Sequence, residues 1–522
     1  MLSKKKIDKL MIRARVFQQK GESRSAEECY NQILQEGYES ATVYYNLGCI
    51  LLERKEYHNA KMLLEKATVL DNHMPNAYFS LGNALRNFGQ YKEAALAYKK
   101  ELQLNPKHKE ALFNMARLYQ IQGESQRAVK AYQQLVEQEP AWGEAWFFLG
   151  QVLEELKHED AAIEAYMAAK DLGCRYPELS IGLGSLAYRK NDIAQALAYY
   201  QQVTAKDQAA YAVAQWNRGI ALLAQGEYRL GFQDYEYRFR AHENNSFMKL
   251  MASAPVWNGE ELLGKRILVV GEQGFGDCIQ FSRYICLLKQ LGAVVSIYVR
   301  KELARLFLSL LGIDEVVVYV DDEELPKSFD WIVPLLSLPR IFDTTLETVP
   351  AGTYLLPEKS KVEFCQKQLP PKQVKVGFVW ASNPDSVSGK ERSCTLKEMA
   401  VLFGNQDVLF VSLQKGKSAQ DIADFRAGNV IDISPALRDF TDTAAVIANL
   451  DLVITVDTAV AHLAGAMGIP VWVLIPWHPD WRWMLSGETS PWYPTMRLFR
   501  QRQRDNWLEV INLVDSELRK LV

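Results

Sequence analysis

The first 200 or so residues of the chain repeat one pattern of small and large apolar positions every 34 residues. Three series keep this step: Gly48, Gly82, Ala116, Gly150 and Gly184; Ala26, Ala60, Ala94, Ala128, Ala162 and Ala196; and Tyr30, Leu64, Tyr98, Tyr132, Tyr166 and Tyr200. Two antiparallel helices cross closely where both present Gly or Ala, and a large side chain fills the space beside the contact. The pattern therefore predicts six helix pairs between about residues 7 and 206.

A 34-residue period with these small and aromatic positions is typical of tetratricopeptide repeats, whereas a generic helical bundle need not keep so even a spacing. Gly89 and Gly123 fall where the first helix of a pair should end, so we expect them at the turn between the helices. A poorer seventh unit runs from about 211 to 240, with Gly219 and Gly226 one residue out of register.

Arrays of this kind curve, and their concave face usually holds an extended segment of another protein. Asn46 and Asn114 occupy the same position on the first helix of their units, and Asn217 is close to equivalent in the last unit. Their amides are suited to bind a peptide backbone without reading its sequence. The alternative, that they are ordinary solvated residues, stays open.

After residue 240 the helical pattern gives way to short apolar runs separated by turn signals. The runs predicted as strands are Ile267–Val270, Val294–Val299, Val316–Val320, Trp331–Pro334, Val374–Trp380, Val408–Leu413, Val430–Ile433, Leu452–Val456 and Val471–Ile475. Helices are expected between them, including Cys278–Leu291, and at the tail, Asp505–Leu521. Pro-rich segments near 349–357 and 369–371 separate two such groups, which predicts two doubly wound parallel sheets.

The predicted organisation is therefore multidomain. An all-α solenoid at 1–240 and a linker at 241–262 precede two α/β lobes at 263–368 and 369–522.

Composition narrows the class of protein. Apolar residues make up 48% and charged residues 24%, and the net charge is -3, which excludes a disordered chain and gives no general attraction to nucleic acid. There is no run of 18 apolar residues, and the basic start, Met1–Leu10, lacks the apolar stretch of a signal peptide. Seven cysteines without a CxxC pair indicate reduced thiols in a cytoplasmic protein.

The first loop with candidate chemistry is Gly271-Glu-Gln-Gly-Phe-Gly-Asp277, between a strand and a helix. Gly271, Gly274 and Gly276 let a ligand approach the backbone, although the spacing is neither GxGxxG nor a P-loop. Asp277 is either a helix cap or a general base.

The second loop is Asp457-Thr458, where a strand meets a helix of small residues. The free amides of that helix start, with the Thr458 hydroxyl, would bind an anion such as phosphate, or Thr458 is simply a cap. His462, one turn further, is either a ligand contact or a core histidine.

Cations and indoles complete the set of candidates. Lys390, Arg392 and Lys415 follow strand ends and would neutralise phosphate, unless they are solvated surface charges. Trp380, Trp477 and Trp481 would stack on a sugar or a base, although indoles also fill cores. No HExxH, GxSxG or clustered Cys/His is present, and the acidic run Asp321–Glu324, without DxD spacing, is expected to be a solvated loop.

With these motifs, residues 265–500 resemble glycosyltransferase family 9, the heptosyltransferases, which have the GT-B fold of two Rossmann-like lobes. Gly276-Asp277 matches the site of the family's catalytic Asp, and Asp457-Thr458 with His462 matches its nucleotide-sugar diphosphate site. Ala459 departs from the family, which usually has Gly there. Repeats joined to such a domain are similar to bacterial transferases implicated in modifying flagellin, and in layout to O-GlcNAc transferase.

The resemblance implies an inverting, metal-independent transfer with no cofactor. Asp277 would take the proton of an acceptor hydroxyl, while helix amides and one of Lys390, Arg392 and Lys415 stabilise the leaving nucleotide. The expected partners are a nucleotide-sugar and an acceptor protein in the groove of the repeats. Two alternatives stay open: an inactive scaffold, and a transferase of lipopolysaccharide or other glycan assembly. The type of sugar (hexosyl, heptosyl or nonulosonyl) and the oligomeric state are not fixed.

Overall fold

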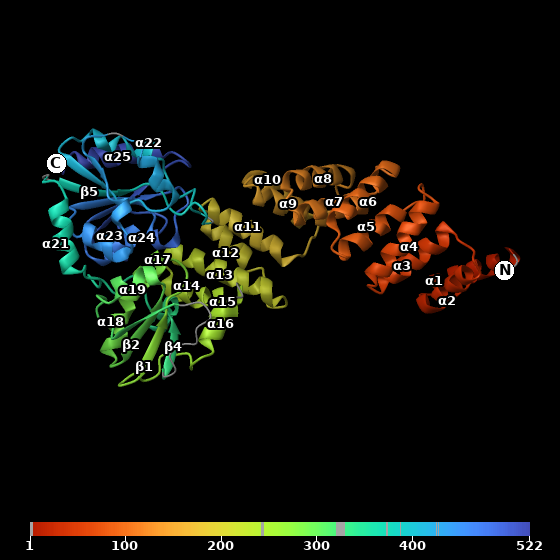
Figure 1. Cartoon of the computed structure of the whole chain (residues 1–522), viewed down its shortest axis with the longest axis horizontal. Coiled ribbons are helices and arrows are strands. Elements are labelled where there is room, and N and C mark those ends of the chain that lie inside the picture. Colours follow the sequence, from red (N-terminus) through yellow and green to blue (C-terminus); the bar gives the residue numbers. More distant parts are fainter. Residues whose placement is uncertain are drawn as a thin grey trace. The chain divides into compact units, whose positions relative to one another are not determined.

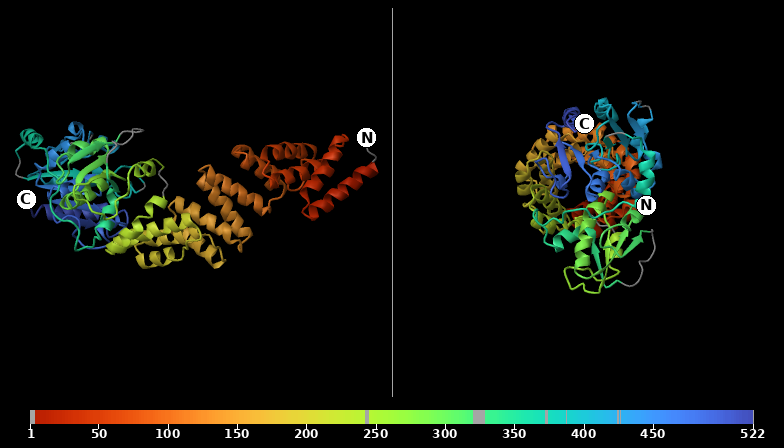
Figure 2. Two further views of the ribbon diagram at one scale, coloured as in Figure 1. Left: turned by 90° about the horizontal axis from the view of Figure 1, so that it is seen from below. Right: turned by 90° about the vertical axis from the view of Figure 1, so that its left-hand side faces the viewer.

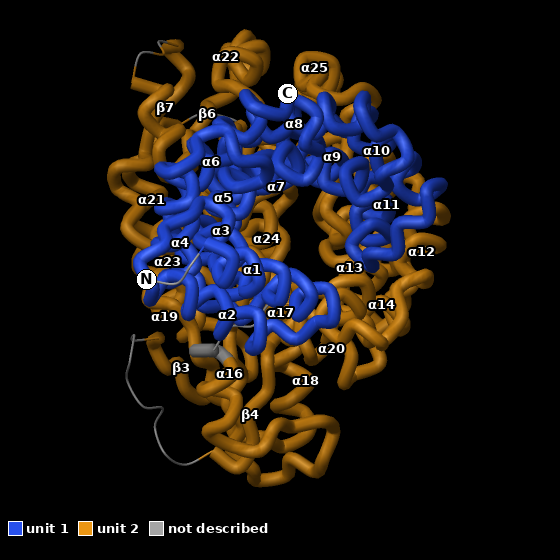
Figure 3. Tube along the Cα trace, turned by 90° about the vertical axis from the view of Figure 1, so that its right-hand side faces the viewer, with its two compact units in different colours: residues 1–186 blue, residues 187–522 orange. Residues whose placement is uncertain are grey.

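The computed structural model describes residues 4–241, 245–319, 329–371, 374–386, 388–423, 425 and 427–521. The chain forms two compact units, residues 1–186 and 187–522 (Figure 3). The division falls inside the sixth helix pair, so the last helices of the repeat array belong to the same unit as both sheets. The predicted end of the array at residue 240 is thus no boundary between compact units. Val320 and the run Asp321–Glu324 lie outside the described residues.

Paired antiparallel helices make up the first unit and the start of the second (Figures 1 and 2). In order they are α1 (Lys4–Gln19), α2 (Ser23–Gln35), α3 (Ala41–Glu53), α4 (Tyr57–Leu70), α5 (Ala77–Asn87), α6 (Tyr91–Leu104), α7 (Lys109–Ile121), α8 (Ser125–Gln138), α9 (Gly143–Glu155), α10 (Glu159–Asp171), α11 (Pro177–Arg189), α12 (Ile193–Tyr200), α13 (Gln208–Gln225), α14 (Tyr228–Tyr235), α15 (Arg238–Ala241) and α16 (Asn245–Met251). The predicted helical array is confirmed, and α16 lies in the stretch expected to be a linker.

The small positions of the repeat lie where the paired helices cross. A Cβ on Gly82 would stand 2.5 Å from a ring carbon of Tyr98, and one on Gly150 would stand 2.5 Å from the ring of Tyr166. These tyrosine rings are buried. The packing expected from the 34-residue pattern is therefore the packing observed, since no side chain larger than Gly fits there without displacing the ring.

The turn within each helix pair uses a left-handed backbone conformation. Gly89 and Gly123 have φ of 84° and 72°, which confirms their predicted place at these turns. The equivalent positions, 34 residues apart, are Gly21 (75°), Lys55 (64°), Lys157 (61°) and Asn191 (61°). The conformation is thus a property of the repeat, and three of its units adopt it without glycine.

Two parallel sheets form the rest of the second unit, which confirms the predicted α/β fold (Figure 1). The first, in the order β3-β2-β1-β4, contains β1 (Arg266–Val270), β2 (Val294–Val299), β3 (Glu315–Val318) and β4 (Trp331–Pro334). The second, in the order β10-β9-β8-β5-β6-β7, contains β5 (Val374–Val379), β6 (Val408–Ser412), β7 (Val430–Asp432), β8 (Leu452–Val456), β9 (Val471–Ile475) and β10 (Met496–Arg500). The second order is the doubly wound one. Strand β10 was not predicted.

Helices cover these sheets: α17 (Phe275–Phe281), α18 (Ile285–Gln290), α19 (Lys301–Phe307), α20 (Leu338–Ile341), α21 (Lys359–Gln368), α22 (Leu396–Met399), α23 (Phe440–Ile447), α24 (Ala459–Ala466) and α25 (Trp507–Leu518). A 3-10 turn at 282–284 divides the helix predicted at 278–291. All seven cysteines are free, as expected. Within the described ranges, none of the helices has the length and apolar character that a membrane span requires.

An aromatic core joins the last repeat to both lobes. Tyr228 of α14 stacks on Trp492, with ring centroids 5.5 Å apart, and Phe232 meets Trp481 at 5.8 Å. Phe281, from the first lobe, lies 5.6 Å from Trp492. These rings are buried, so helix α14 is part of the core that supports both sheets.

The left-handed turns allow a direct test of the backbone argument. Gly89→Ala should lower the free energy of unfolding by about 1–2 kcal/mol, because an L-residue pays that cost in the left-handed region. No atom lies within 4 Å of the added Cβ, so a steric clash does not contribute. Lys55→Ala is the matched control and should change stability by less than about 0.5 kcal/mol. Urea unfolding followed by circular dichroism measures both; equal losses would contradict the explanation.

Candidate functional site

The carboxyl ends of β1 and β8 bring two loops from different lobes together. Strand β1 leads into the glycine loop and α17, and β8 leads into Asp457-Thr458 and α24. A Cβ on Gly276 would lie only 2.9 Å from Cδ2 of His462. The glycine at 276 therefore permits a close approach, as expected, but the group that approaches is a side chain of the other lobe.

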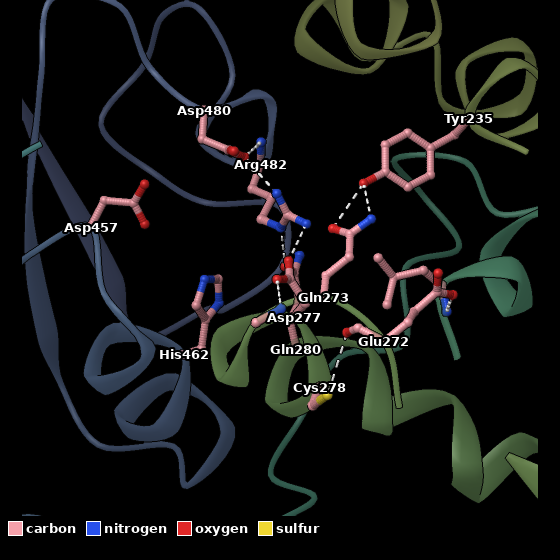
Figure 4. A network of polar contacts seen from close by, with 12 residues as sticks. Tyr235, Glu272, Gln273, Asp277, Cys278, Gln280, Asp457, His462, Asp480 and Arg482 are labelled. Carbon is pink, nitrogen blue, oxygen red and sulfur yellow. Dashed lines mark hydrogen bonds and ion pairs between the residues drawn. The ribbon is translucent and has the colours of Figure 1, made fainter. Parts of the chain in front are cut away.

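Both carboxylate oxygens of Asp277 accept hydrogen bonds. Its Oδ2 accepts a hydrogen bond of 2.8 Å from the amide of Gly274, which is the N-cap of α17. Its Oδ1 accepts one of 2.5 Å from Nη2 of Arg482. Asp277 is thus the third residue of the helix and takes part in its capping through the Gly274 amide, while its second oxygen faces the other lobe (Figure 4).

Arg482 binds residues of both lobes at this place, and it is not among the residues predicted from the sequence. Its Nε donates to Gln280 at 2.7 Å, and its Nη1 donates to Asp480 at 2.8 Å. The guanidinium carbon lies 4.4 Å from the ring centroid of Trp481, and the side chain is 8% exposed. Burial alone would lower the pKa of Arg482, but the carboxylates of Asp480 and Asp277 raise it, so the group stays charged.

Asp480 is the fixed counter-charge of Arg482. Burial alone would raise the pKa of Asp480. The positive charge of Arg482 outweighs the effect of burial, so the pKa of Asp480 is lowered. The segment Pro479-Asp480-Trp481-Arg482 follows β9, at the same edge of the sheet as Asp457. This position after a strand end is visible in the sequence and is the signal that points to these residues.

His462 is neutral and held from two sides. Its Nδ1 lies 3.0 Å from the hydroxyl of Tyr493, and its ring stacks on Trp483 with centroids 5.1 Å apart. Burial, followed by the positive charge of Arg482, lowers the pKa of His462 to about 3. The ring is 5% exposed, so the structure places it as a core histidine that also spaces the two lobes.

Asp457 and Arg392 form an ion pair on the second lobe. Nη1 of Arg392 lies 3.2 Å from Oδ2 of Asp457, which is 4% exposed. Burial raises the pKa of Asp457, and the charge of Arg392 opposes that rise. The Arg392 side chain keeps 23% of its surface exposed. A carboxylate repels phosphate, so Asp457 is suited to orient Arg392 rather than to touch a phosphate group.

The loop that carries Arg392 is fixed by its own hydrogen bonds. Oγ of Ser393 donates to the carbonyl of Gly389 at 2.6 Å and accepts from the amide of Ser382 at 2.9 Å. A Cβ on Gly389 would lie 1.8 Å from the carbonyl oxygen of Asn383, so the closed loop requires glycine there. The loop thus holds Arg392 beside Asp457.

Thr458 is the N-cap residue of α24, but its side chain makes no capping hydrogen bond. Its hydroxyl lies 3.0 Å from that of Thr455 instead. The first amides of α24 are therefore not satisfied by this hydroxyl, and an anion at the helix start would not have to displace it.

The other predicted cations lie in different surroundings. Nζ of Lys415 donates to the carbonyl oxygens of Ser434 (3.0 Å) and Leu437 (2.7 Å), which leaves one N–H. Lys390 is exposed on the loop of Arg392. Of the three, Arg392 is the one that the structure joins to Asp457.

Two of the three predicted indole contacts are core residues. Trp380 is 1% exposed, stacks on Phe378 and donates from Nε1 to Asp421 at 3.3 Å. Trp481 is 3% exposed, beneath the guanidinium of Arg482. Neither indole can stack on a sugar or a base without unpacking the core. The structure therefore speaks against the ligand contact predicted for these two residues. Trp477 is 37% exposed.

The asparagines of the repeats take part in hydrogen bonds within the array. Nδ2 of Asn46 donates to the hydroxyl of Tyr30 at 3.0 Å. Asn114 donates to Oδ1 of Asn83 at 2.8 Å and accepts from Arg86 at 3.3 Å. Asn217 is half-buried. Peptide binding by these residues stays a prediction.

Among the residues that the structure describes, no three or more acidic, histidine or cysteine side chains are placed together to hold a metal ion.

Comparison with known families matches the repeats and part of the second lobe, while the first lobe with Asp277 lies outside the matched ranges. Residues 397–483 match glycosyltransferase family 9 (heptosyltransferase), a range that contains Asp457, His462, Asp480 and Arg482. Residues 41–73, 75–118, 113–173 and 181–242 match tetratricopeptide repeats. The chain combines tetratricopeptide repeats with a glycosyltransferase family 9 domain.

Protein FlbA of Caulobacter vibrioides is 27% identical over 334 residues. The match covers 59% of this chain and 55% of FlbA, so it spans about half of that relative.

Three solved structures with similarity to this chain are two repeat proteins and MamA. A tetratricopeptide repeat protein from Parabacteroides merdae is 20% identical and covers 47% of this chain and 96% of its own, with a TM-score of 0.36. The C-terminal part of a repeat protein from Cytophaga hutchinsonii is 14% identical, covering 45% and 97%, with a TM-score of 0.38. MamA from Desulfovibrio magneticus is 24% identical, covering 32% and 93%, with a TM-score of 0.30.

The buried neutral His462 should make the fold less stable in acid. The pKa of an unfolded histidine is about 6.5, and that of folded His462 is about 3. Between these values the unfolded chain binds a proton that the folded chain does not. The stability from this residue is complete above about pH 6.5 and falls with pH, by up to about 1.4 kcal/mol per unit.

His462→Gln keeps a polar group beside Tyr493 but does not titrate. Its free energy of unfolding in urea should therefore fall less than that of the wild type when the pH is lowered from about 7 to about 5. Parallel losses in the two proteins would contradict the assignment.

Proposed function

We propose that the protein transfers a sugar from a nucleotide-sugar donor to a hydroxyl of an acceptor, with inversion at the anomeric carbon. The observation that carries the proposal is the meeting of Asp277 with Arg482, and of Arg392 with Asp457, at the carboxyl ends of strands of two facing parallel sheets. Ligands of doubly wound folds bind at that edge of a sheet.

On the donor side, Arg392 and the start of α24 receive the diphosphate. Nε of Arg392 has no hydrogen-bond partner among the described residues, and its Nη2 makes only a long contact of 3.5 Å to Ser386. Since Nε is also shielded from solvent, the terminal nitrogens are the donors that the guanidinium can offer to a ligand. As the sugar–oxygen bond breaks, this charge and the helix amides stabilise the departing nucleotide without a requirement for metal.

On the acceptor side, Asp277 is the general base. The acceptor oxygen attacks the anomeric carbon, its proton passes to the Asp277 carboxylate, and the bond to the leaving phosphate breaks. Arg482 and the amide of Gly274 hold one carboxylate oxygen each, which fixes the orientation of the base. A positioned base contributes about 10²–10⁴-fold in rate.

The acceptor is proposed to be a protein held by the repeat array. Helical solenoids bind extended segments of other proteins along their concave face, and Asn46, Asn114 and Asn217 offer amides for such a segment. A lipopolysaccharide or other glycan acceptor is the alternative for the same transferase chemistry.

The donor site is tested by thermal shift with UDP, GDP, ADP, CMP and their sugars. A ligand at about 100 times its Kd should add about 2.7 kcal/mol of stability to the wild type. Arg392→Gln should weaken binding of the same ligand about tenfold or more, because a charge-assisted hydrogen bond is worth about 1.5–3 kcal/mol. Arg502→Gln, at a side chain that is 80% exposed, is the matched control and should bind normally.

The Asp277→Asn variant distinguishes a transferase from an inactive scaffold. It should keep the ligand shift and lose turnover by about 10²-fold or more. Lys390→Gln and Lys415→Gln, tested beside it, show whether a second cation contributes to binding. A folded wild type that shifts with none of the ligands would instead favour an inactive scaffold.

The class of acceptor follows from competition. With the donor identified and both acceptors present, the labelled sugar should be transferred to the acceptor polypeptide rather than to a lipid-linked saccharide. Asn114→Ala should raise the KM for the polypeptide and leave the KM for the donor unchanged, since the residue lies in the repeats. The opposite order of competition would favour glycan assembly.

A further inference from the structure

The glycine loop is held from outside by two residues of the last helical repeat, Tyr235 and Arg238, which we name the repeat clamp. Both residues are buried, at 4% and 5% exposure. They belong to α14 and α15, whereas the loop that they contact belongs to the first sheet. Figure 4 shows Tyr235 and Gln273 meeting beside Asp277.

Arg238 makes a two-pronged ion pair with Glu272 of the loop. Its Nε and Nη2 donate to the two carboxylate oxygens of Glu272 at 3.0 and 2.8 Å. Nη2 also donates to Oγ of Ser337 at 2.9 Å, and Oε1 of Glu272 accepts from the amide of Leu336 at 3.1 Å. The Glu272 side chain is 8% exposed, so this pair fixes its position with little competition from water.

Tyr235 holds the next residue of the loop. Its hydroxyl lies 3.2 Å from Oε1 and 3.0 Å from Nε2 of Gln273. Gln273 has a φ of 61°, in the left-handed region that a residue other than Gly adopts at a cost. Side-chain contacts must stabilise that conformation, and the contact with Tyr235 is one that the structure shows.

The clamp contacts Glu272 and Gln273, which precede the base Asp277 by five and four residues. Gln273 precedes Gly274, whose amide donates to Asp277, and Glu272 accepts a contact of 3.6 Å at its carbonyl from Sγ of Cys278. The backbone between the clamp and Asp277 therefore has little freedom. Displacement of a reacting group by about 1 Å can cost about 10²-fold in rate.

We propose that Tyr235 and Arg238 are positioning residues of the transferase: they set the glycine loop, and through it Asp277, from within the repeat array. This inference rests on the proposed function for the role of Asp277. It makes the last repeat a working part of the catalytic unit, in addition to any part that the array plays in holding an acceptor.

Hydrogen exchange of the full chain tests the clamp without any substrate. Peptides across residues 271–277 are followed by mass spectrometry in the wild type, Tyr235→Phe and Arg238→Lys. Each variant should exchange the Gly274 amide about fivefold faster, the effect of losing one hydrogen bond. Arg218→Lys is the matched control: Arg218 of α13 makes a two-pronged pair with Asp234 of α14, at 2.6 and 2.9 Å. It should leave the loop unchanged.

A kinetic measurement then separates positioning from mere stability. With the donor found by thermal shift, kcat of Tyr235→Phe should fall about tenfold with the donor KM unchanged, and Arg218→Lys should stay within about twofold. Unchanged exchange in Tyr235→Phe, or faster exchange without a fall in kcat, would overturn the inference. An inactive wild type would count against the proposed function, while the exchange result would still decide whether the clamp holds the loop.

Discussion

A buried guanidinium joins the two lobes of this protein. Arg482 belongs to the loop after β9, and it holds Asp277 and Gln280 of the first lobe and Asp480 of its own. Two carboxylates around one cation leave a negative charge that Arg392 and solvent must balance. Breaking such a buried pair leaves an uncompensated charge, at a cost of about 3–5 kcal/mol. Gly276, which meets His462 of α24, directly precedes Asp277 in α17, the residue that Arg482 holds.

The repeats and the sheets could be predicted because their signals are local. A 34-residue period fixes where small residues must lie, and apolar runs such as Leu452–Val456 and Val471–Ile475 have the observed bounds of β8 and β9. Strand β10 was missed because its sequence, Met-Arg-Leu-Phe-Arg, mixes charged and apolar residues and lies beyond a run of tryptophans. Its arginines bind groups that only the folded chain brings near them, as Arg497 binds Glu517.

The site could be predicted only in part, for a physical reason. Asp277, Asp457 and Arg392 follow strand ends, and that position is visible in the sequence. Which cation pairs with which carboxylate depends on tertiary packing: Arg482 lies 205 residues from Asp277 along the chain. Whether an indole fills a core or contacts a ligand also depends on burial: the sequence leaves both open for Trp380, and the structure places it in a core.

The aromatic core also bears on the order in which the chain acquires its structure. Tyr228, Phe232 and Phe281 are covered by Trp481 and Trp492, which lie about 200 or more residues later in the sequence. A ribosome that adds about 5–20 residues per second leaves those rings without their covering for about 10 s or more. The repeats can fold as they emerge because their contacts are local. The last repeat cannot complete its core until the second lobe is made, so the nascent chain exposes apolar surface there for chaperones to protect.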